Sequence, residues 1–298
     1  MFDLTIAIVT YNSENDIRAC IDSIENTKGD LKIEIYVVDN ASIDATVKII
    51  GTGYPDVHLV ANPVNKGFSP ANNQAITSAN GDFILLLNPD TVVLPGALQK
   101  ILEFMKANQQ CGVCGPRLID ASGKCAGDLH APKFWYSVMC LLRIDPFFVK
   151  KMPPLEQQGV SGAAMLFRKS IVSEVGLLDP KLFWCEDLDF CTRARSCGYK
   201  ICIVEDSHIV HYVGQSAKSN PHIAIRSTYF SKLRYARRHY SAIEVSLITC
   251  VYMTESYIRW IKWSIRFILK KDRVSKEKAA AYLFVGSRLF ESFFKVNV

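Results

Sequence analysis

The chain has 298 residues and a net charge of +6; 49% of its residues are hydrophobic and 21% are charged. This composition is typical of a globular protein with a large core, and it excludes global disorder. No apolar run reaches the roughly eighteen residues that a membrane-spanning helix needs. The start, MFDLTIAIVTYN, lacks the basic segment and long apolar run of a signal peptide, so we expect a cytoplasmic protein.

Short apolar runs alternate with helical patterns in the N-terminal part. The predicted strands are 4–9, 33–38, 57–61 and 83–87, and the predicted helices begin after Ser13 and cover 44–50, 70–79 and 95–107. This alternation predicts an α/β fold, a mostly parallel sheet with helices on both faces. Such sheets bind ligands beyond the carboxyl ends of their strands.

Polar residues follow three of these predicted strands. The three segments are Thr10-Tyr11-Asn12, Asp39-Asn40-Ala41-Ser42 and Asn88-Pro89-Asp90-Thr91. The glycine-rich fingerprint of dinucleotide-binding enzymes is absent after the first strand, and the chain has no P-loop motif. The pattern leaves a nucleotide crevice lined with acidic residues. Carboxylates can face a diphosphate only with a divalent cation between them.

Ten cysteines are scattered along the chain without an export signal, so we expect reduced thiols, several of them in the core. Cys111 and Cys114 have the spacing of a zinc or redox pair. No second pair of this spacing completes a tetrahedral site.

The C-terminal part is basic. From residue 222 to the end, fifteen Lys and Arg stand against five Asp and Glu, a net charge of +10, whereas residues 1–221 carry −4. This change of composition predicts a domain boundary near Asn220. No recognisable nucleic-acid-binding module accompanies the charge, so we expect no nucleic-acid partner.

An amphipathic pattern runs through this basic part. Apolar residues recur at three- and seven-residue steps, basic residues form an adjacent stripe, and two tryptophans accompany them: Val251, Ile258, Ile261, Ile265, Ile268; Arg259, Lys262, Arg266, Lys270; Trp260, Trp263. This pattern is typical of a helix that lies in an anionic membrane surface. The alternative is a helix that packs on the rest of the chain and exposes its basic edge to water.

Seven motifs, in this order, resemble those of glycosyltransferase family 2 and, within it, the rhamnosyltransferase subgroup. They are IAIVTYN at 6–12, VVDNASIDAT at 37–46, NKGFSPANN at 65–73, LLLNPDT at 85–91, SGAAMLFRK at 161–169, FWCEDLDFCTRARSCGY at 183–199 and HIVHYVGQS at 208–216. The resemblance implies a GT-A catalytic domain over 1–220, in which 1–110 binds the nucleotide and 111–220 the acceptor. Residues 221–298 would form a basic helical extension.

The resemblance also implies a nucleotide site. Thr10, Tyr11 and Asn12 would line the base pocket, and Asp39 would accept the N–H of the base imide. The further residues implied for this site are Asn40, Asn65, Lys66, Gly67, Asn72, Asn88 and Asp90. Two alternatives stay open: Asp39 could act only as a turn residue before the next helix, and the residues of 65–73 could be ordinary loop and cap residues.

The metal and the catalytic base follow from the same resemblance. Asp90 matches the second acid of the family's Asp-x-Asp motif, whose first position is Asn88 here, so His211 is expected to help to bind Mg²⁺ or Mn²⁺. Asp187 is implied as the base and Glu186 as its neighbour that orients the acceptor; burial and nearby charge are expected to raise the pKa of Asp187. Asp189 is expected to cap the following helix.

These expectations combine into an inverting glycosyltransferase that moves L-rhamnose from dTDP-rhamnose to a glycan acceptor in cell-surface polysaccharide synthesis, such as that of O-antigen. The aromatic segment at 133–151 and the basic extension favour a lipid-linked acceptor and a peripheral position on the inner face of the cell membrane. The closest alternative uses a UDP-linked galactose, galactofuranose or N-acetylhexosamine. A sugar nucleotidyltransferase and a non-catalytic scaffold are further alternatives.

Overall fold

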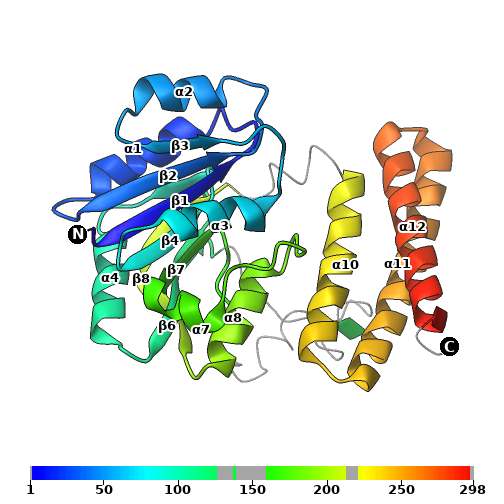
Figure 1. The fold of residues 1–298 in the computed structure, drawn as a ribbon. Helices are drawn as coiled ribbons and strands as arrows, with labels where there is room; N and C mark the ends of the chain where they lie inside the picture. The colour runs from blue at the N-terminus through cyan, green and yellow to red at the C-terminus, as the bar shows by residue number, and fades with distance from the viewer. Residues whose placement is uncertain (1, 126–136, 139–158, 213–220, 296–298) are drawn as a thin grey trace. The chain divides into compact units, whose positions relative to one another are not determined.

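A computed structural model describes residues 2–125, 137–138, 159–212 and 221–295. Contacts group these residues into two compact units, which we describe separately (Figure 1). Unit 1 comprises 2–125, 159–181 and 186–212; unit 2 comprises 137–138, 182–185 and 221–295. Most of the aromatic segment 133–151 and the predicted boundary near Asn220 lie outside the described residues, so the domain limits stay a prediction.

Unit 1 is built on an eight-stranded sheet of order β3-β2-β1-β4-β7-β6-β8-β5 (Figure 1). The strands are β1 (Leu4–Thr10), β2 (Ile33–Asp39), β3 (His58–Ala61), β4 (Phe83–Leu87), β5 (Thr91–Val93), β6 (Cys111–Ile119), β7 (Ala164–Arg168) and β8 (Lys200–His211). β1 runs parallel to β2 and β4, and β2 runs parallel to β3. β7 is antiparallel to β4 and β6, so the sheet is parallel in its N-terminal half and mixed beyond it.

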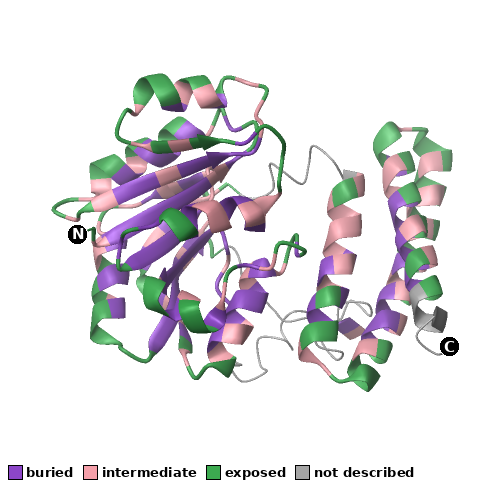
Figure 2. Ribbon diagram, in the orientation of Figure 1, coloured by how far each residue is buried: buried purple, intermediate pink, exposed green. Residues whose placement is uncertain are grey.

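Helices cover both faces of this sheet. One face packs against α1 (Ile17–Thr27), α2 (Thr46–Gly53) and α4 (Ala97–Ala107), and the other against α3 (Phe68–Ser78), α7 (Val172–Val175) and α8 (Glu186–Ser196). Successive strand residues alternate between the two cores: Leu85 faces the first, and Ile84 and Leu86 face the second. The predicted run of buried apolar residues at 83–87 is thereby confirmed, and Figure 2 shows the central strands as buried.

One helix begins later than predicted. Ser13 does not cap α1, because its carbonyl accepts the N–H groups of Asp16 and Ile17 at 3.1 and 3.0 Å and its own N–H donates to Thr46 Oγ1 at 2.8 Å. These bonds form a turn over 14–16, and the helix begins at Ile17.

Unit 2 contains three packed helices, α10 (Pro221–His239), α11 (Ala242–Lys270) and α12 (Arg273–Lys295), which Figure 1 shows side by side. Their shared core includes Leu233 from α10, Ile248 from α11 and Val285 from α12. α11 begins with a capping box between Ser241 and Glu244, the arrangement that satisfies free N–H groups at a helix start. Within the described residues, no helix is both long enough and apolar enough to span a membrane.

Candidate active site

The carboxyl ends of β1 and β2 lie side by side at one edge of the sheet. Thr10 and Asp39 are register partners in this parallel pair, and Thr10 Oγ1 donates to Asp39 Oδ1 at 2.8 Å. β4 ends at the same edge, because Leu87 pairs with Ile8 on the other side of β1. The structure therefore brings together the three segments that sequence analysis singled out.

Asp39 makes the hydrogen bonds expected of a turn residue, which is the alternative role that the sequence analysis left open. The Ser42 N–H donates to Asp39 Oδ2 at 2.8 Å, and Ser42 Oγ donates to Oδ1 at 2.5 Å. The neighbouring Asn12 adopts a φ of 53°, and its Oδ1 accepts the N–H of Ile43 at 2.9 Å. Since a carboxylate has about four lone-pair sites, these bonds leave Asp39 the capacity to accept a further donor. Tyr11 is 54% exposed beside this turn.

The side chain of Asn40 fixes the loop around Asn65, Lys66 and Gly67 through hydrogen bonds. The buried Asn40 donates through Nδ2 to the Gly67 carbonyl at 3.1 Å, and its Oδ1 accepts the Lys66 N–H at 3.4 Å. Asn65 Oδ1 accepts the Gly67 N–H at 2.9 Å, and Asn72 Nδ2 donates to the Phe68 carbonyl at 3.1 Å. These side chains shape the loop and the start of α3, as the alternative in the sequence analysis expected. Their contact with a nucleotide stays a prediction.

Asp90 and His211, the two predicted metal ligands, lie close together. The strand pair β5–β8 places Thr91 opposite His211, and the Tyr212 N–H donates to the Asp90 carbonyl at 3.0 Å. As a result, His211 Nε2 lies 3.3 Å from Asp90 Oδ1, and both side chains are largely buried. Sequence analysis did not connect a further carboxylate with this pair, that of Asp16 in the turn before α1: burial and the charge of Asp90 raise the pKa of Asp16.

The Asp90–His211 pair offers one oxygen and one nitrogen ligand. In the part of the chain that the structure describes, no three His, Cys, Asp or Glu side chains form a metal-binding group. The pair therefore does not form a closed protein cage. It fits an ion that takes its remaining ligands from water and substrate phosphates.

Asp187 is linked to the same edge of the sheet through the two residues directly before β7. The Asn88 N–H donates to the Ala163 carbonyl at 2.9 Å, and the preceding residue, Gly162, donates its N–H to Asp187 Oδ2 at 2.8 Å. The Leu188 N–H donates to Asp187 Oδ1 at 2.7 Å. Burial raises the pKa of Asp187, and these backbone hydrogen bonds reduce the rise; the predicted direction is confirmed.

Gly162 lies between Asp187 and α3. A Cβ at this position would be 3.5 Å from Asp187 Cβ and 3.5 Å from Phe68 Cε1. Sequence analysis did not foresee that the Gly162 amide fixes the Asp187 carboxylate, because that hydrogen bond joins residues 25 positions apart.

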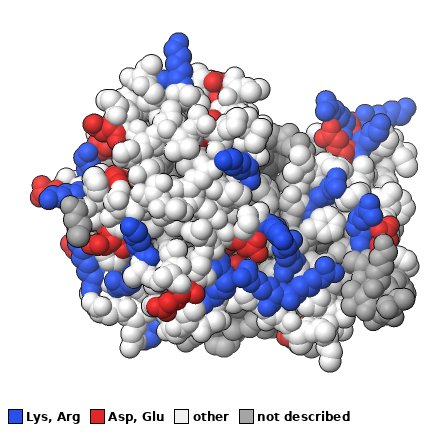
Figure 3. Space-filling view, viewed as in Figure 1, with Lys and Arg blue, Asp and Glu red and all other residues white. Residues whose placement is uncertain are grey.

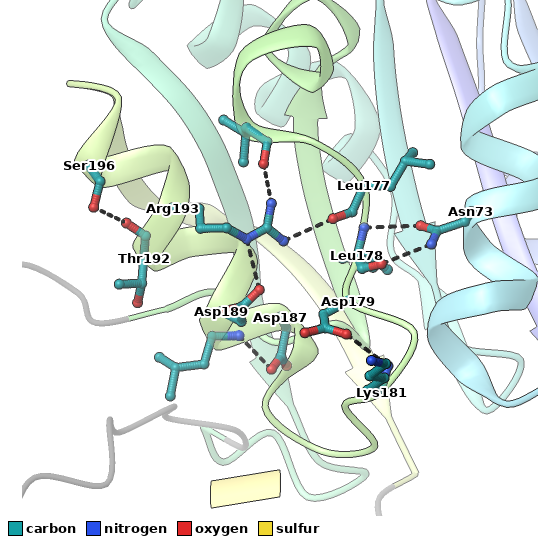
Figure 4. Close-up of polar contacts among 12 residues, drawn as sticks. Asn73, Leu177, Leu178, Asp179, Lys181, Asp187, Asp189, Thr192, Arg193 and Ser196 are labelled. Carbon is teal, nitrogen blue, oxygen red and sulfur yellow. Dashed lines mark hydrogen bonds and ion pairs between the residues drawn. The ribbon is translucent and has the colours of Figure 1, made fainter. Parts of the chain in front are cut away.

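A second network holds α8 against the end of α7 and the loop that follows it (Figure 4). Arg193 Nε forms an ion pair with the fully buried Asp189 at 2.8 Å, and its other nitrogens donate to the carbonyls of Val175 and Leu177. Asn73 on α3 holds the next residue of that loop, since it donates to the Leu178 carbonyl at 2.9 Å and accepts its N–H at 3.0 Å (Figure 4).

The network corrects one prediction. α8 begins at Glu186, so Asp189 lies inside its first turn and pairs with Arg193 instead of occupying the cap position. Glu186 is itself buried. Directly before it, Trp184 and Cys185 adopt left-handed φ values of 73° and 82°. Non-glycine residues in this region cost about 1–3 kcal/mol each and are concentrated at functional sites.

The cysteines of the described residues are all free thiols. Burial raises the pKa of Cys191 to about 12. Cys111 differs, because a hydrogen bond with Cys114 contributes most to lowering its pKa, to about 7, although its side chain is buried.

Comparisons with known proteins agree with this geometry. The sequence pattern of the family described as Glycosyl transferase family 2 matches residues 5–176. An N-acetylglucosaminyl-diphospho-decaprenol L-rhamnosyltransferase of Mycobacterium tuberculosis is 24% identical over 261 residues, 76% of this chain and 82% of the relative. Among the relatives is also a low-salt glycan biosynthesis hexosyltransferase of Haloferax volcanii, 26% identical over 65% of this chain and 62% of its own length.

A solved structure shares the fold. A mannosyltransferase from Pyrobaculum calidifontis, in complex with GDP-Man and Mn²⁺, superposes with a TM-score of 0.60 over 96% of this chain and 86% of its own, at 16% identity. The fold and the matched sequence pattern, which covers more than half of the chain, lead to one conclusion. The chain belongs to glycosyltransferase family 2 and is a glycosyltransferase with a GT-A fold.

Proposed function

We propose that this enzyme transfers L-rhamnose from dTDP-L-rhamnose to a lipid-linked glycan, with inversion at the anomeric carbon. The observation that carries the transfer chemistry is the partly buried Asp187 carboxylate, which Gly162 holds beside the strand end that bears Asn88. The Mycobacterium relative supports the sugar and the acceptor class, because its name states a rhamnosyl transfer to a diphospho-decaprenol-linked sugar. The product would serve the synthesis of a cell-surface polysaccharide at the inner face of the membrane.

The donor nucleotide would occupy the edge formed by β1, β2 and β4. Thr10, Tyr11, Asn12 and Asp39 would surround the base, with the remaining acceptor capacity of Asp39 directed at the imide N–H. The diphosphate would lie toward the Asn65–Gly67 loop and the Asn88–Asp90 turn. The residues assigned to this site are Thr10, Tyr11, Asn12, Asp39, Asn40, Asn65, Lys66, Gly67, Asn72, Asn88 and Asp90.

A divalent cation, Mg²⁺ or Mn²⁺, would be held by Asp90 and His211. When bound, it would neutralise charge on the diphosphate leaving group. The bound Mn²⁺ of the structural neighbour makes a metal plausible for this fold. The neighbouring Asp16, whose pKa is raised, would interact more favourably with the site once a cation offsets the charge of Asp90.

Asp187 would act as the general base. Its carboxylate takes the proton of the acceptor hydroxyl while the hydroxyl oxygen bonds to the anomeric carbon and the bond to the diphosphate breaks. The amides of Gly162 and Leu188 fix the orientation of the carboxylate, and its raised pKa makes it a stronger proton acceptor. Glu186, the preceding residue on α8, would orient the acceptor.

A thermal-shift panel tests the donor. Each of dTDP-L-rhamnose, UDP-galactose, UDP-N-acetylglucosamine and GDP-mannose is added with and without Mn²⁺. A donor at a hundred times its Kd stabilises the fold by about 2.7 kcal/mol, which raises the melting temperature by roughly 5 °C or more. We expect the largest rise with dTDP-L-rhamnose and metal. A larger rise with a UDP-sugar would favour the alternative donor, and no rise with any sugar nucleotide would contradict the proposal.

A further inference from the structure

The long helix α11 has one face in the core of unit 2. Ile248, Val251 and Tyr252 are buried there, against side chains of α10 and α12. Trp260 and Trp263 also pack against this core. This corrects the sequence analysis, which counted Val251 and both tryptophans in the pattern of a membrane-surface helix.

The opposite face of α11 carries a stripe of exposed aliphatic side chains. Its members are Ile258 (53% exposed), Ile261 (51%), Ile265 (53%), Ile268 (70%) and Leu269 (78%). Spacings of three and four residues place them on one side of the helix, over roughly 17 Å at 1.5 Å per residue. Ile243 and Leu247 extend the same side toward the helix start and are also exposed. Contiguous apolar surface of this kind marks an interaction site.

A row of exposed basic residues borders this stripe. Lys262, Arg266 and Lys270 follow one another at four-residue steps, and Lys271 is the C-cap of the helix. The sequence from 256 to 271 contains no Asp or Glu. Figure 3 shows Lys and Arg side chains gathered at the end of unit 2 where α11 meets α12, with acidic side chains beside them. Arg259 does not belong to this row, because it pairs with Glu255 and its guanidinium lies 5.7 Å from the ring of Tyr282.

The charges decide which partner fits the stripe. If two copies of the chain paired through it, both basic rows would meet at one interface without an acid on this part of the helix to offset them. An anionic bilayer has the complementary arrangement, with acyl chains for the isoleucines and acidic headgroups for the basic row.

We propose that α11 lies flat on an anionic lipid bilayer, with Ile258, Ile261, Ile265, Ile268 and Leu269 in the acyl boundary and Lys262, Arg266 and Lys270 at the headgroups. This inference deepens the proposed function. It rests on that function in one respect: the membrane contact would bring the enzyme to a lipid-linked acceptor. Its evidence is separate, because the stripe and the basic row lie in unit 2 and the proposed catalytic residues lie in unit 1.

Co-sedimentation of the full chain with vesicles tests the proposal. The vesicles are phosphatidylcholine alone, or phosphatidylcholine with 30 mol% phosphatidylglycerol at about 0.1 M salt, a concentration chosen because the Debye length is then about 10 Å. We expect binding to the anionic vesicles that weakens at about 0.5 M salt, and little binding to the neutral ones. Absence of binding to anionic vesicles would overturn the proposal.

Two variants and a matched control locate the contact. Replacing Lys262, Arg266 and Lys270 by Gln should lower the partition coefficient about a hundredfold, at about 1 kcal/mol per charge. Replacing Ile261, Ile265 and Ile268 by Ser should lower it at least about tenfold. The control replaces Lys32, Lys48 and Lys124, three exposed lysines of unit 1, by Gln. It removes the same net charge and should bind as the wild type does.

Equal losses in the control and the Lys262/Arg266/Lys270 variant would show attraction by net charge alone and overturn the proposal. So would a wild type that self-associates in light scattering, does not bind vesicles and becomes monomeric with the Ser substitutions. The thermal shift with the sugar-nucleotide donor and Mn²⁺ should be the same for all variants. A wild-type chain that fails to bind anionic vesicles but keeps its thermal shift with the donor would therefore refute the membrane surface and leave the proposed transferase function standing.

Discussion

Asp187→Asn is predicted to abolish transfer while donor binding persists. Both carboxylate oxygens accept a backbone N–H, Oδ2 from Gly162 at 2.8 Å and Oδ1 from Leu188 at 2.7 Å. Asparagine has a single acceptor oxygen, so one of these amides would face an NH₂ group. The lost bond to a charged acceptor costs about 1.5–3 kcal/mol, and removing a charge from a partly buried position offsets part of this.

The catalytic loss should be much larger than the loss of stability. A positioned general base contributes about 10²- to 10⁴-fold to the rate, so turnover should fall at least a hundredfold while the donor Kd changes less than about threefold. Single-turnover rates and calorimetric titration of the donor measure the two quantities separately.

Asp189→Asn is the matched control, two residues along the same helix. It removes the partner of Arg193 in a buried ion pair, which should lower the free energy of unfolding by about 3–5 kcal/mol. Its turnover at a temperature where the protein is folded should fall less than about tenfold. The assignment of the base fails if Asp187→Asn keeps more than a few per cent of wild-type turnover, or if the two variants lose turnover equally.

Three further predictions concern the proposed metal and the edge of the sheet where β1, β2 and β4 begin. Asp90→Ala should reduce donor affinity in Mn²⁺ at least tenfold, to the value that calorimetry gives without metal; equal affinities of the wild type with and without metal would exclude a metal site. Gly81→Ala should lower the melting temperature by several degrees, about 1–3 kcal/mol, because the new Cβ would lie 2.6 Å from the Thr5 nitrogen; an unchanged melting temperature would contradict the steric argument. Burial raises the pKa of Glu34, but hydrogen bonds from Thr5, Asn80 and Gly81 outweigh it and hold the pKa below its usual 4.5. The stability that this carboxylate contributes is therefore complete above about pH 4.5 and is lost as the pH falls through the lowered value, so the melting-temperature difference between wild type and Glu34→Gln should shrink in that range; a constant difference would refute the shift.

The N-terminal half of the fold could be predicted because its signals are local. The buried run at 83–87 and the polar residues after three of the predicted strands follow from hydrophobic periodicity and from the rule that ligands bind at the carboxyl ends of parallel strands. The antiparallel strand β7 was not predicted as such, since its partners β4 and β6 are far away in sequence. Local patterns carry no information on such pairings.

The candidate site, too, could be predicted only in part. Asp90 and His211 were named from motifs, and the β5–β8 pairing brings them together. The support of Asp187 by Gly162 was missed, because a backbone N–H has no signature in the sequence. Asp189 was misassigned for a related reason: its i,i+4 pairing with Arg193 could be read from the sequence only once the helix start was known.

Product analysis tests the central claim most directly. The full chain is incubated with dTDP-L-rhamnose, Mn²⁺ and a polyprenyl-diphospho-N-acetylglucosamine acceptor, and the product is examined by NMR at its new anomeric centre. We predict one added rhamnose with the anomeric configuration opposite to that of the donor, and no such product from the Asp187→Asn variant. A product with the donor's configuration, or transfer from UDP-sugars alone, would contradict the account.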